Sequence, residues 1–298
     1  MTICNPYYAA YFTNPNKGRE IILDILLCGK EKTYCFNSEA FDLMETFSVS
    51  QIWKKKLSSF KNKTFSNDEM HRKLNSIFPS NGYKTTKKKV LEACAIAAYH
   101  QRTDIPVVTT LLSDDAPQFK QIAYQHALCW IHDGRNYKKL RPIVPYFNGK
   151  LEGFLDKYWD FYGELCEFQE IPDSEVAKQL STKFDQLFST VTGYERLDER
   201  ISKTKENKEY LLRVLVLPEV PLHNNAAELA ARAKVRKRDV SLQTITDEGT
   251  KANDTFMTIV QTAKKLDVSA YKYILDRVSK KFEMPSLAQL IRERSSSN

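Results

Sequence analysis

The sequence predicts an α/β fold interrupted by an all-helical segment, and two observations lead to this prediction. The run from Val107 to Leu112, just after Pro106, is apolar and rich in β-branched residues, which is typical of a buried strand. From Gly149 onward, large apolar residues recur at helical spacing without a strand-like run, which indicates packed helices. A chain of 298 residues with 42% hydrophobic content can form one large domain that carries such an insertion.

The region before this strand alternates short strands and helices. The turn pair Asn5-Pro6 divides the first apolar run, and the sequence from Pro79 to Gly82 breaks the chain again. Between these breaks, residues 50–82 are polar and lysine-bearing, so we expect short helices there at best. The expected elements are a β-hairpin at 1–13, helices at 17–29 and 38–47, a strand at 33–36, and a buried Ala-rich helix at 85–100.

The region after this strand is expected to become mostly helical. Trp130 closes a second predicted strand, and core packing is favoured for it over stacking on a base. The expected elements are a strand at 127–130, a basic helix at 132–140, helices at 151–165, 176–188, 256–266 and 269–278, and a last short helix. We therefore divide the chain into a first part of the α/β core at 1–147, a helical insertion at 148–215, and a C-terminal part of the core at 216–298.

The charge of the chain is basic and clustered. There are 45 lysines and arginines against 37 acids, a formal charge of +8. The clusters are Lys54 to Lys56 with Lys61 and Lys63, Lys84 with Lys87 to Lys89, and the run 232–238. Such clusters favour an anionic partner, most simply nucleic acid, although a single lysine run is more often a solvated helix face.

The cysteines and the hydropathy pattern point to a reducing cytoplasm. Six scattered cysteines form no Cys-x-x-Cys pair, so no disulfide framework is expected. Cys129 and His132 have the spacing of a zinc ligand pair, but a second pair does not accompany them, so a structural zinc site is the less favoured reading. The sequence shows neither a leader nor an apolar run long enough for a bilayer, so secretion and membrane insertion are not expected.

Glu228 is the first candidate site residue. It follows a helix start at Asn224 or Asn225, and the basic residues Arg232, Lys234, Arg236, Lys237 and Arg238 follow it. A carboxylate is a candidate metal ligand, and the basic residues suit phosphate groups. A structural alternative stands beside this reading. With Asn225 as the cap, Glu228 would complete a capping box, and it also lies four residues before Arg232 as a surface pair.

Asp114 is the second candidate, because it lies at the end of the predicted strand 107–112. Ligands gather at the carboxyl ends of strands in open α/β sheets, and there a carboxylate could share a divalent ion with Glu228. The alternative is that the residues from Ser113 to Pro117 only form a turn with an Asx cap ahead of a short helix. The residues alone do not decide between these two readings.

Two blocks of the sequence carry a resemblance to a known family. The segment from Pro221 to Leu229, continued by Lys237 to Ser241, resembles the C-terminal signature of DDE transposases of the insertion sequence 66 family. The segments Ser113 to Phe119 and Leu128 to Tyr137 are similar to that family's strand with the second acid and its Cys-Trp-x-His segment. Both blocks have the order found in the family, with a large gap between them.

The resemblance implies a transposase of a bacterial mobile element with a ribonuclease H-like mixed sheet flanked by helices. Asp114, in preference to Asp115, and Glu228 would be catalytic acids and ligands of Mg²⁺ or Mn²⁺. The partner would be DNA at the element ends, with a homo-oligomer as a further expectation. The DNA-binding residues would be Arg135, Arg232, Lys234, Arg236, Lys237 and Arg238.

The resemblance also raises an expectation about the first acid. In the family this acid lies on the first, central strand, immediately ahead of a hairpin such as the one predicted at 1–13. Asp24 lies on a predicted helix and is a poor substitute. We therefore expect an N-terminally truncated chain with its first strand missing and with weak or absent activity. The alternative from another class is a non-enzymatic protein that binds nucleic acid or a partner through the basic surface.

Overall fold

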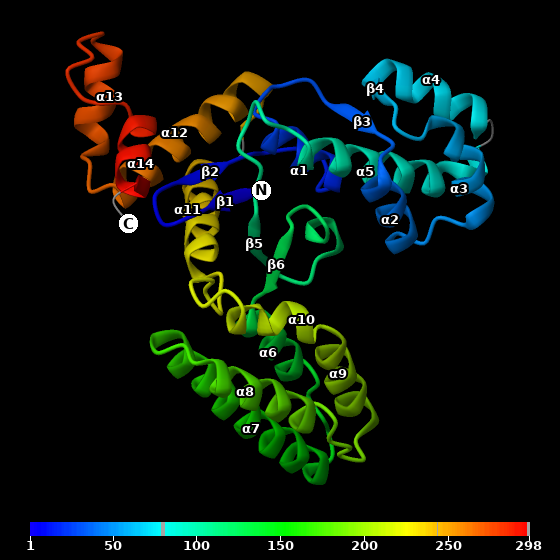
Figure 1. Ribbon diagram of the computed structural model, residues 1–298. Helices are drawn as coiled ribbons and strands as arrows, with labels where there is room; N and C mark the ends of the chain where they lie inside the picture. Colours follow the sequence, from blue (N-terminus) through cyan, green and yellow to red (C-terminus); the bar gives the residue numbers. More distant parts are fainter. Residues whose placement is uncertain (79–80, 243, 297–298) are drawn as a thin grey trace. The chain divides into compact units, whose positions relative to one another are not determined.

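The computed structural model describes residues 1–78, 81–242 and 244–296 (Figure 1). The described residues form two compact units. One unit combines Met1–Lys17 with Asn224–Asn298, and the other is Gly18–His223. We refer to them as the split unit and the central unit.

The split unit begins with the predicted hairpin. Strands β1 (Thr2–Cys4) and β2 (Ala9–Tyr11) pair antiparallel. The amides of Ala9 and Tyr11 bond to the hydroxyls of Thr262 and Thr258 at 3.3 and 3.1 Å, so a helix satisfies the outer edge of β2. The helices of this unit are α11 (Asn225–Ser241), α12 (Asp247–Lys265), α13 (Ala270–Val278) and α14 (Leu287–Ser296).

The first part of the central unit is built around the buried helix α5 (Lys84–His100). Its residues from Val90 to Tyr99 are all buried, as the Ala-rich sequence predicts. Strands β3 (Thr33–Cys35) and β4 (Thr64–Ser66) pair antiparallel beside it. The accompanying helices are α1 (Arg19–Leu26), α2 (Ser38–Thr46), α3 (Gln51–Leu57), α4 (Asn67–Ile77) and the short turns η1 (Ser58–Phe60) and η2 (Asn81–Tyr83).

The next part of the central unit contains a parallel pair of strands. Strands β5 (Thr110–Ser113) and β6 (Gln125–Leu128) are joined by a connection that includes η3 (Pro117–Phe119). Helix α6 (Trp130–Lys138) starts two residues after β6 ends. The predicted strand at 107–112 is therefore present but starts later, and the second strand lies slightly before its predicted range.

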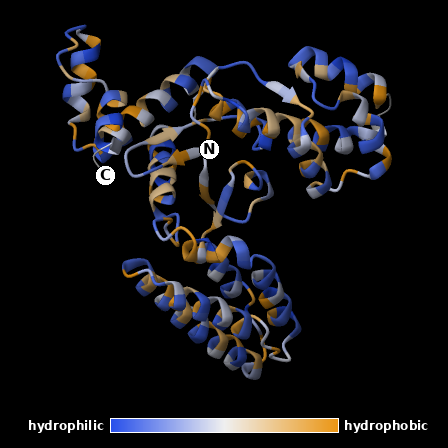
Figure 2. Cartoon of the chain, in the orientation of Figure 1, coloured by the Kyte–Doolittle hydropathy of each residue, from blue (hydrophilic) through white to orange (hydrophobic). Residues whose placement is uncertain are grey.

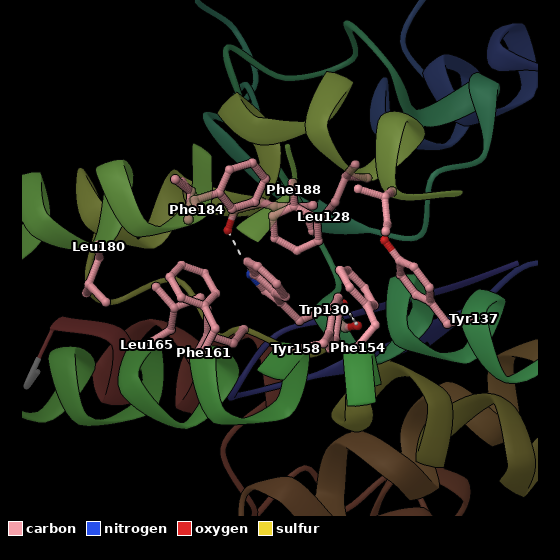
Figure 3. Packing of buried hydrophobic residues seen from close by; sticks show 14 of the residues in the cluster. Leu128, Trp130, Tyr137, Phe154, Tyr158, Phe161, Leu165, Leu180, Phe184 and Phe188 are labelled. Carbon is pink, nitrogen blue, oxygen red and sulfur yellow. Dashed lines mark hydrogen bonds between the residues drawn. The ribbon is translucent and has the colours of Figure 1, made fainter. Parts of the chain in front are cut away.

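The last part of the central unit is entirely helical. It consists of α7 (Pro145–Glu170), α8 (Ser174–Leu187), α9 (Glu195–Glu206), α10 (Lys208–Leu211) and η4 (Leu212–Leu215). Its core is a buried cluster around Trp130, which is 0% exposed and donates its indole N–H to the carbonyl of Leu211 at 2.8 Å (Figure 3). Core packing, the favoured role of Trp130, is confirmed. Figure 2 shows hydrophobic and hydrophilic residues alternating along α7 and α8, as amphipathic helices require.

The architecture is mixed α/β and mostly helical. The described strands form three separate two-stranded sheets rather than the expected single mixed sheet. Each strand is only three or four residues long, so it offers few backbone groups for further pairing. Within the described ranges, no helix combines the length and the apolar character needed to cross a bilayer.

Candidate functional site

Asp114 lies immediately after the last residue of β5, as the sequence predicts. Its Oδ1 accepts a hydrogen bond from the amide of Ala116 at 3.3 Å. This bond is the Asx turn of the structural alternative, but it is long and occupies one carboxylate oxygen. The turn therefore orients Asp114 without using its full capacity as an acceptor.

Asp115 is placed differently from its neighbour. One of its carboxylate oxygens lies 2.8 Å from the ammonium of Lys120, and the other accepts a hydrogen bond from the side-chain amide of Asn207 at 3.2 Å. Both oxygens therefore bind groups of the protein itself, across a sequence distance of 92 residues in the case of Asn207. This arrangement assigns Asp115 a structural role and supports the preference for Asp114 as the metal ligand.

A cavity of about 260 Å³ opens beside Asp114 in the central unit. It brings the candidate acid together with Arg135 of α6, a candidate DNA-binding residue. The other lining residues are polar for the most part. They are Asp115, Ala116, Leu128, Cys129, His132, Asp133, Asn136 and Lys139. Carboxylates and cations that line one cavity can hold a metal ion together with a phosphate group.

A buried hydroxyl and imidazole pair supports the strand end that carries Asp114. The hydroxyl of Ser113 donates to the carbonyl of Asp114 at 2.6 Å, and its oxygen lies 2.8 Å from Nε2 of His126 on β6. Because a hydroxyl has one proton, Nε2 must be the donor in the second bond. Burial, aided by Lys120, lowers the pKa of His126 to about 4, so this imidazole is neutral at pH 7.

Asp133 holds α6 in place, although no pattern in the sequence indicates this role. Its carboxylate is buried, pairs with Arg200 of α9, and accepts hydrogen bonds from Thr204 at 2.9 Å and Tyr158 at 3.1 Å. Burial raises the pKa of Asp133, and Arg200 opposes that rise. This network ties α6 to the helical part of the unit and thereby positions Arg135 on the cavity wall.

Glu228 lies in the first turn of α11, in the split unit. The N-cap is Asn224, without a side-chain capping bond, and the amide of Glu228 donates to the carbonyl of Asn224 at 3.0 Å. Glu228 is therefore the fourth helical residue, one position beyond the capping-box glutamate that the structural alternative requires. Arg232, four residues further along α11, is exposed.

The basic residues of α11 divide into two groups. The side chain of Lys234 pairs with Asp254 and bonds to the hydroxyl of Thr13, so it has a structural role inside the split unit. The remaining basic residues are exposed and stay candidates for DNA contact. They are Arg232, Arg236, Lys237 and Arg238.

The carboxylate of Asp114 has the oxygen chemistry that Mg²⁺ and Mn²⁺ prefer in a ligand. Within residues 1–78, 81–242 and 244–296, no group of three His, Cys, Asp or Glu side chains is arranged to hold a metal ion. Mg²⁺ in phosphoryl-transfer sites commonly binds only one or two carboxylates together with substrate phosphates. A single carboxylate such as Asp114, in a cavity that Arg135 also lines, is therefore compatible with this type of site.

The chain is similar to a known protein family over part of its length and to a bacterial protein over most of its length. The sequence model described as "Transposase IS66 family" matches residues 97–252, a range that includes Asp114, Arg135 and Glu228. An uncharacterized protein, y4jO of Sinorhizobium fredii (strain NBRC 101917 / NGR234), is 30% identical over 272 residues, which cover 91% of this chain and 84% of that protein. No solved structure matches the chain.

Proposed function

The chain belongs to the IS66 family of transposases, and from this premise we propose that it cuts and rejoins DNA by a DDE-type reaction. The observation that carries the proposal is the position of Asp114, directly after β5 and on the wall of a cavity that Arg135 also lines. The parallel pair β5 and β6 is compatible with a ribonuclease H-like core, and we include that fold in the proposal.

The proposed reaction has two steps at phosphorus. In the first, water attacks a phosphodiester at the element end, the bond to the 3′ oxygen breaks, and a free 3′ hydroxyl is formed. In the second, this hydroxyl attacks a phosphodiester of the target and displaces its 3′ oxygen. A divalent metal held by Asp114 and Glu228 would supply activation of the attacking oxygen and neutralisation of phosphate charge.

The protein side chains have separate tasks in this proposal. Asp114 and Glu228 would be the carboxylate ligands of the metal ion. Arg135, in the cavity with Asp114, contacts a non-bridging phosphate oxygen. The exposed cations of α11 bind the phosphate backbone of the flanking DNA. These cations are Arg232, Arg236, Lys237 and Arg238.

We also propose that strand cleavage by this chain alone is weak. The family's reaction uses three acids, and the residues of this chain match the second and the third. Each carboxylate contributes charge that holds the two cations, so a pair of acids binds them less tightly than three do. Weak activity is therefore expected even at high metal concentration.

The experiment is a nicking assay on supercoiled DNA with Mn²⁺. We expect slow nicking that Asp114→Asn and Glu228→Gln each reduce to background. The matched control is Asp115→Asn, which removes a neighbouring charge that Lys120 and Asn207 already bind, and it should leave nicking within a few-fold of the parent.

Two results would contradict the proposal. One is nicking that survives both substitutions, which would point to a contaminating nuclease. The other is an absence of nicking at every Mn²⁺ concentration while DNA binding is retained, which would favour the non-enzymatic binding protein.

A further inference from the structure

The net charge of the chain resides almost entirely in one segment outside the family match. Residues 51–90 contain eleven lysines and arginines against two acids, a formal charge of +9, whereas the whole chain carries +8. The rest of the chain is therefore close to neutral. The segment precedes residues 97–252, so the likeness to IS66 transposases does not account for it.

Aromatic side chains hold this segment together as one structured surface. The ring of Trp53 on α3 lies 4.4 Å from that of Phe78, just after α4, and 4.8 Å from that of Tyr83 at the start of α5. The ammonium of Lys73 lies 4.9 Å from the ring centre of Phe65. These contacts join the two helices to the beginning of α5, and Figure 1 shows these elements grouped together. The lysines are thus displayed on packed elements rather than on a loose linker.

One of its turns is fixed so that it presents two lysines. Asn62 has a positive φ of 62°, its amide donates to the carbonyl of Phe36 at 2.8 Å, and the amide of Phe36 donates to the carbonyl of Lys63 at 3.0 Å. Both backbone bonds anchor the turn to the end of β3. Lys61 and Lys63, on either side of Asn62, are exposed.

Few of these positive charges are neutralised by acids. Lys54 pairs with Glu45 at 3.0 Å, and Lys88 lies 3.9 Å from Glu92. Several other exposed lysines have no acidic partner in the part of the chain that the structure describes. These are Lys55, Lys61, Lys63 and Lys84. Bringing like charges together without counter-charges costs free energy, which an anionic ligand would recover.

We propose that this surface, which we call the lysine platform and define as Lys55, Lys61, Lys63 and Lys84, binds the DNA phosphate backbone. Of the eleven cations in residues 51–90, ten are lysines. Lysine acts as a point charge on a flexible stem, which suits contacts to phosphate groups, and such contacts carry no base information directly. The platform therefore contacts DNA independently of sequence. DNA as its ligand rests on the proposed function.

The test measures binding of a fluorescent duplex oligonucleotide to the full chain across a range of salt concentrations. The variant replaces Lys55, Lys61, Lys63 and Lys84 with glutamine. The matched control also removes four charges, at Lys157, Lys203, Lys264 and Lys281, which are equally exposed. The proposal predicts that the platform variant lowers the slope of log affinity against log salt by about two to four, and weakens binding at least tenfold near ~0.1 M salt.

Several outcomes would overturn the inference. The first three are an equal loss of DNA affinity in the platform variant and the control, no loss of affinity in the platform variant, and no DNA binding by the parent chain. The fourth is that polyglutamate competes as effectively per charge as DNA does. The nicking assay keeps this test separate from the proposed function. Binding that depends on the platform without Mn²⁺-dependent nicking rejects the enzyme and keeps the platform. If nicking depends on Asp114 but the platform variant binds DNA as well as the parent does, the lysine platform is rejected and the enzyme is kept.

Discussion

Nε2 of His126 lies 2.8 Å from the hydroxyl oxygen of Ser113, and Ser113 in turn donates to the carbonyl of Asp114. The other ring nitrogen, Nδ1, is buried and has no hydrogen-bond partner among the described residues. In the neutral ring Nδ1 is only an acceptor, but protonation would place an unpaired N–H in the interior. This geometry explains why the folded protein resists charging His126.

The first prediction concerns pH. The pKa of His126 is lowered to about 4 in the folded protein and returns to about 6.5 on unfolding, so between these values the unfolded state binds more protons. Stability therefore falls as the pH falls from 6.5 to 4, by on the order of 3 kcal/mol for this group. Urea denaturation at pH 7 and pH 5 measures the change.

The control for this prediction is His126→Gln, which keeps a donor for Ser113 but does not titrate. The charged neighbours Lys120, Asp115 and Arg213 remain in both proteins, so the difference in pH dependence isolates His126. Equal pH dependence of stability in the parent and the variant would show that folding does not lower the pKa of His126.

The second prediction concerns Gly134 of α6. A Cβ atom at this position would lie 2.7 Å from two ring carbons of Trp159 on α7, whereas a Cβ at Gly163 of α7 would meet nothing within 4 Å. Gly163→Ala should stabilise the protein by about 0.5–1 kcal/mol, because alanine favours the helix. Gly134→Ala should instead destabilise it by about 1–3 kcal/mol through overpacking. Thermal denaturation of both variants checks the opposite signs.

Several elements were predictable because their signals are local. The turn pair Asn5-Pro6 and the Ala-rich run of α5 both correspond to elements of the expected type. The strand predicted from Val107 begins later, at Thr110, because the amide of Val108 bonds to the hydroxyl of Tyr99 at 2.9 Å instead of to a neighbouring strand. A run of β-branched residues indicates strand tendency but does not reveal which backbone groups find a partner.

The polar region from 50 to 82 contains a local helix signal that hydrophobic periodicity does not detect. Helix α4 has a capping box, in which Ser66 and Glu69 satisfy each other's backbone amides, and this Ser-x-x-Glu pattern is visible in the sequence. The helix has eleven residues and is longer than the short helices expected in this region. Strand β4, which precedes it, is not among the expected elements. Hydrophobic periodicity alone underestimates a helix that buries only Met70 and Leu74.

The local positions of the two candidate carboxylates were predictable from the sequence, but the residues that support the Asp114 cavity were not. Asp114 and Glu228 stand beside local turn and helix signals, whereas Asp133 and Arg200 are 67 residues apart. No pattern in the sequence indicates this ion pair, because each residue alone resembles an ordinary charged residue on a helix surface. Long-range ion pairs of this kind require the three-dimensional structure.

The third prediction tests the Asp133 network. Arg200→Leu leaves the buried carboxylate of Asp133 without its counter-charge, so we expect a loss of about 3–5 kcal/mol at pH 7. Burial already raises the pKa of Asp133, and removing Arg200 raises it further, so the folded variant binds a proton that the unfolded chain releases. The loss should therefore shrink as the pH falls from 7 to 5.

The matched variant for this network is Asp133→Asn combined with Arg200→Leu. It removes both charges and keeps a polar group near Thr204 and Tyr158, so it should be more stable than Arg200→Leu alone at pH 7. Chemical denaturation of the two variants gives the comparison. A double variant as unstable as the single one would mean that Arg200 contributes through packing on Tyr137 rather than through charge.

The last prediction separates the two groups of cations on α11. Lys234 pairs with Asp254, which also binds the hydroxyl of Thr13 at 3.1 Å, whereas Lys237 is exposed. Lys234→Gln should destabilise the split unit by about 1–3 kcal/mol, because Asp254 loses its counter-charge, with little specific effect on DNA binding. Lys237→Gln should leave stability within about 0.5 kcal/mol and lower the salt slope of DNA binding by about 0.9. Denaturation and DNA titration of both variants decide the assignment, and the reverse pattern would place Lys234, not Lys237, on the DNA.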